Sequence, residues 1–118
     1  VFMDNVKITC ENCKGKKFRE EILDVRYKNK NIYDIMQMTI LEAMEFFIAY
    51  PQIRKALSFL KEVGLDYLQL GQNTSTFSGG EIQRIKIARE LSESSHRETL
   101  YILDEPTTGL HFREVHLL

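Results

Sequence analysis

The sequence predicts an α+β fold, in which a small extended segment leads into a helical subdomain and then into one strand of a parallel sheet. Apolar and charged residues alternate over residues 23–28, as in half-buried strands. Helix-capping signals and apolar residues at helical spacing occupy residues 31–96. The apolar run at 100–103 then ends at two carboxylates and a proline, as a buried parallel strand can. We therefore divide the chain into segments 1–30, 31–96 and 97–118, and expect the rest of the sheet to lie outside it.

The first segment combines extended patterning with a short turn that carries the only two cysteines. Leu23, Val25 and Tyr27 alternate with charged residues, which predicts a strand. Cys10 and Cys13 are too close in sequence for an ordinary structural disulfide. With no signal-peptide pattern at the start of the chain, this indicates thiols in a reducing cytoplasm, for metal binding or for redox chemistry.

Two helices are predicted in the first part of the helical subdomain. Thr39 followed three residues later by Glu42 is a capping box, and Pro51 suits the first turn of the next helix. Gly64 can then end that helix in a left-handed conformation. The residues expected on the buried faces are Leu41, Met44, Phe47 and Ile48 for the first helix, and Ile53, Ala56, Leu57, Leu60 and Val63 for the second.

A third helix is predicted to begin within FSGGE, residues 77–81. Ser78 and Glu81 form a second capping box, and Gly79 and Gly80 leave the N–H groups of the first turn uncovered by side chains. Those N–H groups, the positive end of the helix dipole and the serine hydroxyl can together bind a phosphate. An ordinary capped helix is the alternative. The expected buried face consists of Ile82, Ile85, Ala88 and Leu91.

The carboxylates Asp104 and Glu105 follow the apolar run directly. An aspartate at the end of a buried strand can hold Mg²⁺, and a neighbouring glutamate can act as a general base on a water molecule. Many strands end in an acidic turn, which is the simpler alternative.

Composition limits the possible function classes. The 118 residues are enough for one domain with a hydrophobic core, and no apolar run approaches the roughly 18 residues that span a bilayer. The net charge is −1, so any affinity for nucleic acid must come from a local basic patch.

Taken together in their order and spacing, these motifs resemble those of ABC-type ATPases. FSGGE is similar to the signature motif of that family, and LYILDE to its Walker B strand. The residues that follow, Thr108, Gly109, Leu110 and His111, resemble the D-loop. The resemblance implies that Ser78, Gly79, Gly80 and Glu81 contact a nucleotide held by the Walker A loop of another domain.

Further stretches narrow the resemblance to the UvrA family, the damage-recognition subunits of bacterial excinucleases. Transporters usually have Gln in place of Glu81 and Asp in place of His111, and they lack a C-x-x-C-x-G-K segment before the signature. The stretches ILDVRYKNKNIYDIMQMTILEAMEFF, GLDYLQLGQ and TFSGGEIQRIKIARELS are all similar to the second nucleotide-binding half of UvrA. The chain is therefore interpreted as part of a longer protein.

The resemblance implies a cytoplasmic ATPase of nucleotide excision repair and the SOS response, which uses ATP and Mg²⁺. Its implied partners are damaged double-stranded DNA, a second copy of itself and the helicase-like subunit UvrB. Glu105 and Asp104 would be catalytic, with Asp104 holding the magnesium. No G-x-x-x-x-G-K-[ST] loop occurs in these 118 residues, so we expect the isolated chain to be inactive and not to bind ATP measurably.

Cys10 and Cys13 resemble half of the family's zinc module. A structural zinc site needs four ligands, and the resemblance places a second C-x-x-C pair upstream of residue 1. We expect zinc in the longer protein and not in this chain. A redox C-x-x-C is the alternative, although no βαβ pattern surrounds it.

Basic residues crowd the cysteine turn and recur on the third helix. Lys14, Lys16, Lys17 and Arg19 are candidates for contact with DNA phosphates, with a solvated turn as the equal alternative. On the helix, solvation or contact with a partner domain is the favoured interpretation for Arg84, Lys86 and Arg89.

Two alternative functions remain open on sequence alone. The chain could belong to another ABC ATPase, although a transporter would lack the cysteines and an SMC-type protein would show long heptads. It could instead be a non-catalytic zinc-and-helix interaction module, in which Asp104 and Glu105 would be replaceable without loss of activity.

Overall fold

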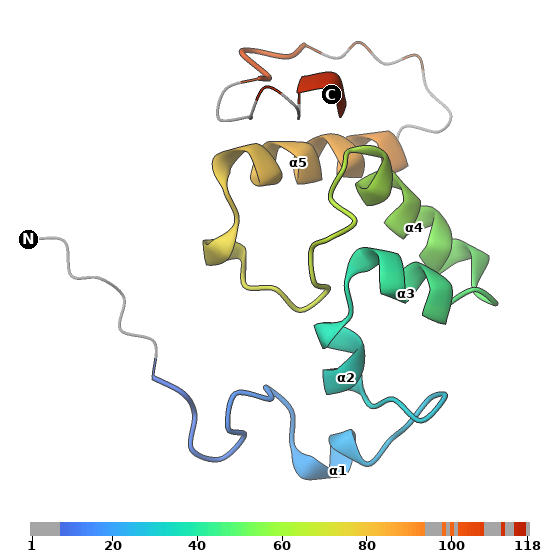
Figure 1. The fold of residues 1–118 in the computed structure, drawn as a ribbon, viewed down its shortest axis with the longest axis vertical. Coiled ribbons are helices and arrows are strands. Elements are labelled where there is room, and N and C mark those ends of the chain that lie inside the picture. Colours follow the sequence, from blue (N-terminus) through green and yellow to red (C-terminus); the bar gives the residue numbers. More distant parts are fainter. Residues whose placement is uncertain are drawn as a thin grey trace, which may run out of the picture. The chain divides into compact units, whose positions relative to one another are not determined.

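The computed structural model describes residues 8–93, 98, 100, 102–107, 112 and 115–117. The chain divides into two compact units, residues 1–36 and 37–118. The described residues form helices and turns, shown in Figure 1: α1 (Glu20–Leu23), α2 (Ile32–Gln37), α3 (Ile40–Phe46), α4 (Pro51–Glu62), the 3₁₀ turn η1 (Thr74–Thr76), α5 (Gly79–Glu93) and the 3₁₀ turn η2 (Val115–Leu117).

The prediction of a strand over residues 23–28 is wrong. Its first residue ends helix α1, and the chain then closes into a tight turn in which Tyr27 and Lys30 exchange hydrogen bonds of 2.9 and 3.0 Å. The two residues inside the turn, Lys28 and Asn29, have φ angles of 47° and 63°. The described residues contain no neighbouring strand with which this segment could pair, so its backbone makes hydrogen bonds within the turn.

The predicted strand at 100–103 is also not formed among the residues that can be described. Leu100, Ile102 and Leu103 lie outside any strand and expose 86%, 86% and 56% of their surface. A strand depends on hydrogen bonds to a neighbour, and the described part of the chain contains no strand that could supply them. The fold is therefore largely helical, where the sequence predicted α+β.

Helix α3 begins where the sequence predicted. The Thr39 hydroxyl oxygen accepts the N–H of Glu42 at 3.2 Å, and the Glu42 carboxylate accepts the N–H of Thr39 at 2.8 Å. The segment that follows α4 covers this helix start, because the N–H of Ile40 donates to the carbonyl of Leu68 at 2.9 Å. Reciprocal capping and this loop together satisfy donors that have no partner inside the helix.

Helix α4 begins at Pro51, as predicted, and its last residue, Glu62, is followed by a Schellman motif at Val63 and Gly64. Gly64 has a φ of 73°. Its N–H donates to the carbonyl of Lys61, and the N–H of Leu65 donates to the carbonyl of Leu60, both at 2.9 Å. Leu65 is completely buried after the turn. The glycine thus directs the chain back across the helices.

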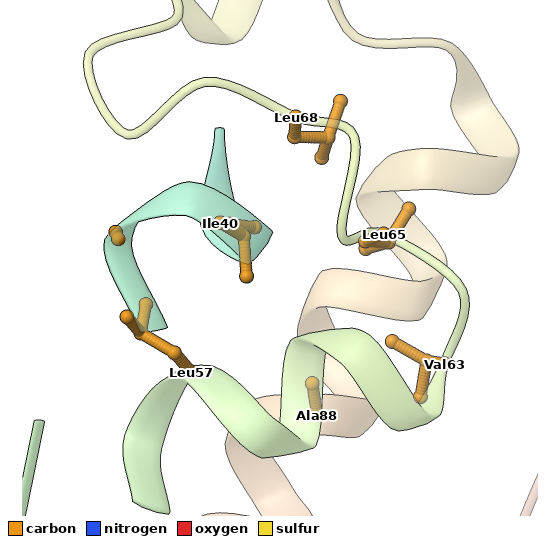
Figure 2. Packing of buried hydrophobic residues seen from close by; sticks show 7 residues of the cluster. Ile40, Leu57, Val63, Leu65, Leu68 and Ala88 are labelled. Carbon is orange, nitrogen blue, oxygen red and sulfur yellow. The ribbon is translucent and has the colours of Figure 1, made fainter. Parts of the chain in front are cut away.

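The core lies between α3, α4 and α5. Helix α4 packs against α3 on one side and α5 on the other (Figure 1). Two leucines of the loop after α4 point into the same cluster (Figure 2). The buried members are Ile40, Ala43, Leu57, Val63, Leu65, Leu68 and Ala88.

Some residues predicted to lie on buried helix faces are exposed in the structure. Leu57, Val63 and Ala88 are buried as expected, but Ile48 and Ile82 expose 63% and 39% of their surface. On α5 the buried positions are Gly80, Arg84 and Ala88, spaced four residues apart. The apolar pattern alone missed this face, because an arginine occupies its middle.

Gly64 yields a test of the helix stop. Gly64→Ala should lower the free energy of unfolding by roughly 1–2 kcal/mol, because a Cβ disfavours the left-handed conformation at this position. Gly79→Ala is the matched control, since a Cβ there would meet no atom within 4 Å and the residue has no left-handed φ. Urea denaturation followed by circular dichroism compares the two variants. Equal stabilities would contradict the role given to Gly64.

Candidate functional site

The first turn of α5 is built by a reciprocal cap. The Ser78 hydroxyl oxygen accepts the N–H of Glu81 at 3.2 Å, and Glu81 Oε2 accepts the N–H of Ser78 at 2.7 Å. The first backbone bond of the helix follows, from the N–H of Ile82 to the carbonyl of Ser78 at 3.1 Å. The predicted capping box is therefore confirmed, and the serine is held at the tip of a 15-residue helix.

The two glycines of this turn differ in their surroundings. Gly79 is exposed, and a Cβ built on it would meet nothing within 4 Å. Gly80 is buried on the face that α5 turns to the core. The open space at the start of α5 is therefore at Gly79, because the core face of the helix begins at position 80.

Glu81 has a second partner that the sequence did not indicate. The hydroxyl of Tyr67 donates to Glu81 Oε1 at 2.6 Å, so the two carboxylate oxygens are bound on different sides. The pKa of the Glu81 carboxyl group is lowered, mainly by the hydrogen bond from the Tyr67 hydroxyl and to a smaller extent by that from the Ser78 N–H. The pKa of the Tyr67 hydroxyl is raised, mainly by burial and to a smaller extent by its hydrogen bond to Glu81. Tyr67 lies 14 positions before Glu81, beyond the reach of any local spacing rule.

Arg84 is buried, whereas the sequence favoured solvation or contact with a partner domain. With 1% of its surface exposed, it is the largest fully buried side chain among the described residues. Its guanidinium donates to the carbonyl of Val63 at 3.2 Å and reaches that of Gly64 at 3.5 Å. These carbonyls lie at the negative end of α4, where a cation is stabilised. Arg89 does follow the expectation, since it is exposed and pairs with Glu93 at 3.0 Å.

Lys86, the third basic residue of α5, is also exposed. With Arg89 it keeps the outer face of the helix solvated, so only Arg84 among the three departs from the sequence-based interpretation.

The acids after the apolar run are exposed and are not joined to the other candidate residues. Among the residues that the structure describes, neither Asp104 nor Glu105 takes part in a hydrogen bond or an ion pair, and Glu105 has a φ of 44°. The candidate D-loop residues Thr108, Gly109, Leu110 and His111 lie outside the described residues. The roles of these residues remain predictions.

The cysteine turn is closed by backbone hydrogen bonds. The N–H of Lys14 donates to the carbonyl of Cys10, and that of Lys16 to the carbonyl of Cys13, both at 2.8 Å. Hydrogen bonds from the backbone N–H groups of Cys13 and, to a smaller extent, of Asn12 lower the pKa of the Cys10 thiol. These donors favour a thiolate, which is the form that binds metal. However, the described residues contain no group of three or more potential ligands, so two thiols alone do not complete a structural zinc site.

The four basic candidates near the cysteines line one open hollow. Lys14, Lys16, Lys17 and Arg19 border a cavity of about 410 Å³, together with Cys13 and Phe18 among others. All four basic residues are exposed. The structure thus brings them together within the first unit, which is compatible with an anion-binding surface and with a solvated turn.

Comparison with known proteins identifies the family. The family model for ABC transporters matches residues 4–108. The chain is 56% identical over 114 residues to UvrABC system protein A of Borreliella burgdorferi, and 50% identical over 117 residues to that of Escherichia coli K12. The chain belongs to the UvrA branch of the ABC family.

The likeness to UvrA extends to the fold but covers a small part of its length. The crystal structure of UvrA2 from Deinococcus radiodurans matches 92% of this chain with a TM-score of 0.85 and 49% identity. The two sequence matches include 97% and 99% of this chain. The chain spans only 12% of the length of each of these UvrA proteins and 13% of the UvrA2 chain. Within the described residues, no helix is both long and apolar enough to cross a membrane.

The two hydrogen bonds to Glu81 predict a pH dependence. They stabilise the carboxylate and depress its pKa in the folded state, so their contribution is full above the ordinary value of 4.5 and is lost as pH falls through the lower folded value. Thermal unfolding between about pH 3 and pH 7 should therefore show a smaller acid destabilisation in Glu81→Gln than in the wild type. Glu45→Gln, at an exposed position on α3, is the control. Identical pH profiles for wild type and Glu81→Gln would contradict this assignment.

Proposed function

We propose that this chain is part of a DNA damage-recognition ABC ATPase of nucleotide excision repair. It would supply the signature turn of one composite ATP site and the Walker B acids of another. The observation that carries the proposal is the capped start of α5, with Ser78 at its tip and open space at Gly79, in a chain of the UvrA branch. A site of this kind contacts a nucleotide that a different domain holds.

The capping geometry supports a phosphate-binding role for the turn. The Ser78 oxygen accepts a hydrogen bond from Glu81, which leaves the hydroxyl proton available to a phosphate oxygen. Gly79 and Gly80 occupy the first two helical positions, whose N–H groups have no acceptor within the helix. The positive end of the helix dipole adds to both. Glu81 holds this arrangement and does not itself face the phosphate in the proposal, because both of its oxygens are already bound.

The acids supply the second half of the chemistry. Asp104 would bind Mg²⁺, which neutralises charge on the phosphates when bound, and Glu105 would take a proton from the attacking water. Both side chains are exposed, which leaves them accessible to groups from another domain. The D-loop residues Thr108, Gly109, Leu110 and His111 would lie between the two composite sites.

Partners of the longer protein follow from the same family relationship. We propose damaged double-stranded DNA, a second copy of the protein and UvrB as partners, in the cytoplasm and within the SOS response. Lys14, Lys16, Lys17 and Arg19 would contact DNA phosphates, and their position around one hollow, which Glu20 and Glu21 also line, supports this role. Cys10 and Cys13 would supply two of four zinc ligands, with the other two from residues outside this chain.

The open position at Gly79 provides the main test, in the full-length protein. Gly79→Asp should abolish ATP-dependent closure and reduce hydrolysis at least about tenfold, since it places a carboxylate where a phosphate must approach. Folding should be retained, because the added side chain has free space and a carboxylate stabilises a helix N-terminus. The measurements are steady-state hydrolysis, and dimerisation followed by light scattering during ATP titration.

The control for this variant is Gln52→Asp, which adds the same charge at an exposed position in the first turn of α4. It should behave as the wild type. Normal hydrolysis and normal dimerisation in Gly79→Asp would overturn the phosphate role of the turn. Gly80→Asp is less informative, because burial of a carboxylate at that position would also disturb packing.

The acids are tested separately. In the full-length protein, Glu105→Gln should bind ATP and Mg²⁺ normally but lose most hydrolysis, about 10²-fold or more, because the general base is removed. Asp104→Asn should instead raise the Mg²⁺ concentration needed for half-maximal rate. Glu98→Gln, at a nearby exposed position, should have no effect. A wild-type rate in Glu105→Gln would show that another group activates the water.

A further inference from the structure

Within the described residues, Tyr67 is the one side chain outside α5 whose hydrogen bond to the capping-box carboxylate of Glu81 is found. Its hydroxyl reaches Glu81 Oε1 at 2.6 Å, while Oε2 of the same carboxylate holds the N–H of Ser78 at 2.7 Å. A carboxylate bound at both oxygens cannot rotate about its last bond without losing one of them. The orientation of the cap at Ser78 is therefore coupled to the position of Tyr67.

Tyr67 itself lies on a segment that is fixed to the core. Leu65 and Leu68, on either side of it, are 0% and 4% exposed. The N–H of Leu68 donates to the carbonyl of Leu65 at 3.2 Å, and its carbonyl accepts the N–H of Ile40 on α3. The tyrosine hydroxyl is thus presented by a rigid support, although the residue as a whole exposes 53% of its surface.

A second link, one helical turn further along α5, holds the same segment. Arg84 binds the carbonyls of Val63 and Gly64, which lie just before the segment that carries Tyr67. Residues 81 and 84 are three positions apart, so both links leave α5 on neighbouring parts of one face. Two polar contacts thus hold the first two turns of α5 to the end of α4 and to the loop that follows it.

From this arrangement we infer that Tyr67 is a positioning residue for the signature turn. Its hydroxyl fixes Glu81, and through Glu81 it keeps the Ser78 hydroxyl aimed in one direction. The inference rests on the proposed function, and it assigns to the UvrA-type signature a support that lies outside the motif. Tyr67 does not touch the nucleotide; it acts through Glu81 and Ser78.

The test is a double-mutant cycle on ATP hydrolysis by the full-length protein. Tyr67→Phe keeps the ring and removes only the hydroxyl. It should lower kcat/KM roughly 3- to 10-fold, the effect of one hydrogen bond to a charged group in part-exposed surroundings. Ser78→Ala should also lower kcat/KM. In the double variant the loss should not exceed that of Ser78→Ala alone, because Tyr67 acts only through the serine cap.

Two controls separate positioning from general stability. Tyr33→Phe removes a hydroxyl from α2 that has no hydrogen-bond partner within the described part of the chain, and it should hydrolyse ATP at the wild-type rate. Glu81→Gln tests the link itself, and its loss should be smaller than that of Glu81→Ala, because the amide oxygen can accept from Ser78 while the NH₂ donates to the tyrosine oxygen. Glu81→Ala should resemble Tyr67→Phe or be worse.

The outcomes distinguish the two levels of inference. If Ser78→Ala leaves hydrolysis unchanged, the proposed function itself fails, and the role of Tyr67 falls with it. If Ser78→Ala is slow but Tyr67→Phe is normal, the positioning role is overturned alone. Losses that multiply in the double variant would overturn it as well, since they would mean that Tyr67 acts independently of the cap.

Discussion

The buried guanidinium of Arg84 is the interaction on which the rest of the second unit depends. A cation in a core requires partners, and here they are the carbonyls of Val63 and Gly64 at the end of α4. Hydrogen bonds to a charged group contribute about 1.5–3 kcal/mol, more than a neutral pair. One of these carbonyls belongs to Gly64, whose left-handed conformation ends α4 at the same point.

From this link the arrangement of the site follows in order. Arg84 sets the distance between α5 and the end of α4, and Leu65 and Leu68 then bury the segment beyond it. That segment carries Tyr67 to the first turn of α5, where Glu81 and Ser78 complete the cap. The exposed tip of the helix is therefore supported by the core through this segment.

Features set by neighbours three or four residues apart could be predicted from the sequence. Both capping boxes, the proline at the start of α4 and the stop at Gly64 depend on contacts of this kind, and all four are present. The two predicted strands are not found among the described residues. A strand forms only against a partner strand, and a local sequence pattern does not show whether that partner is present. The Tyr67 contact escaped prediction for a similar reason: its partner is distant in sequence.

The exposed run at Leu100, Ile102 and Leu103 has a consequence for the chain in solution. A short apolar segment without a proline and without charge offers unpaired backbone groups to any other copy that presents the same segment, which is how edge-to-edge aggregation begins. Asp104, Glu105 and Pro106 follow it at once, and residues of these types act as gatekeepers against such stacking. The carboxylates proposed for catalysis would therefore also protect the isolated chain from self-association, and neutralising them would remove that protection.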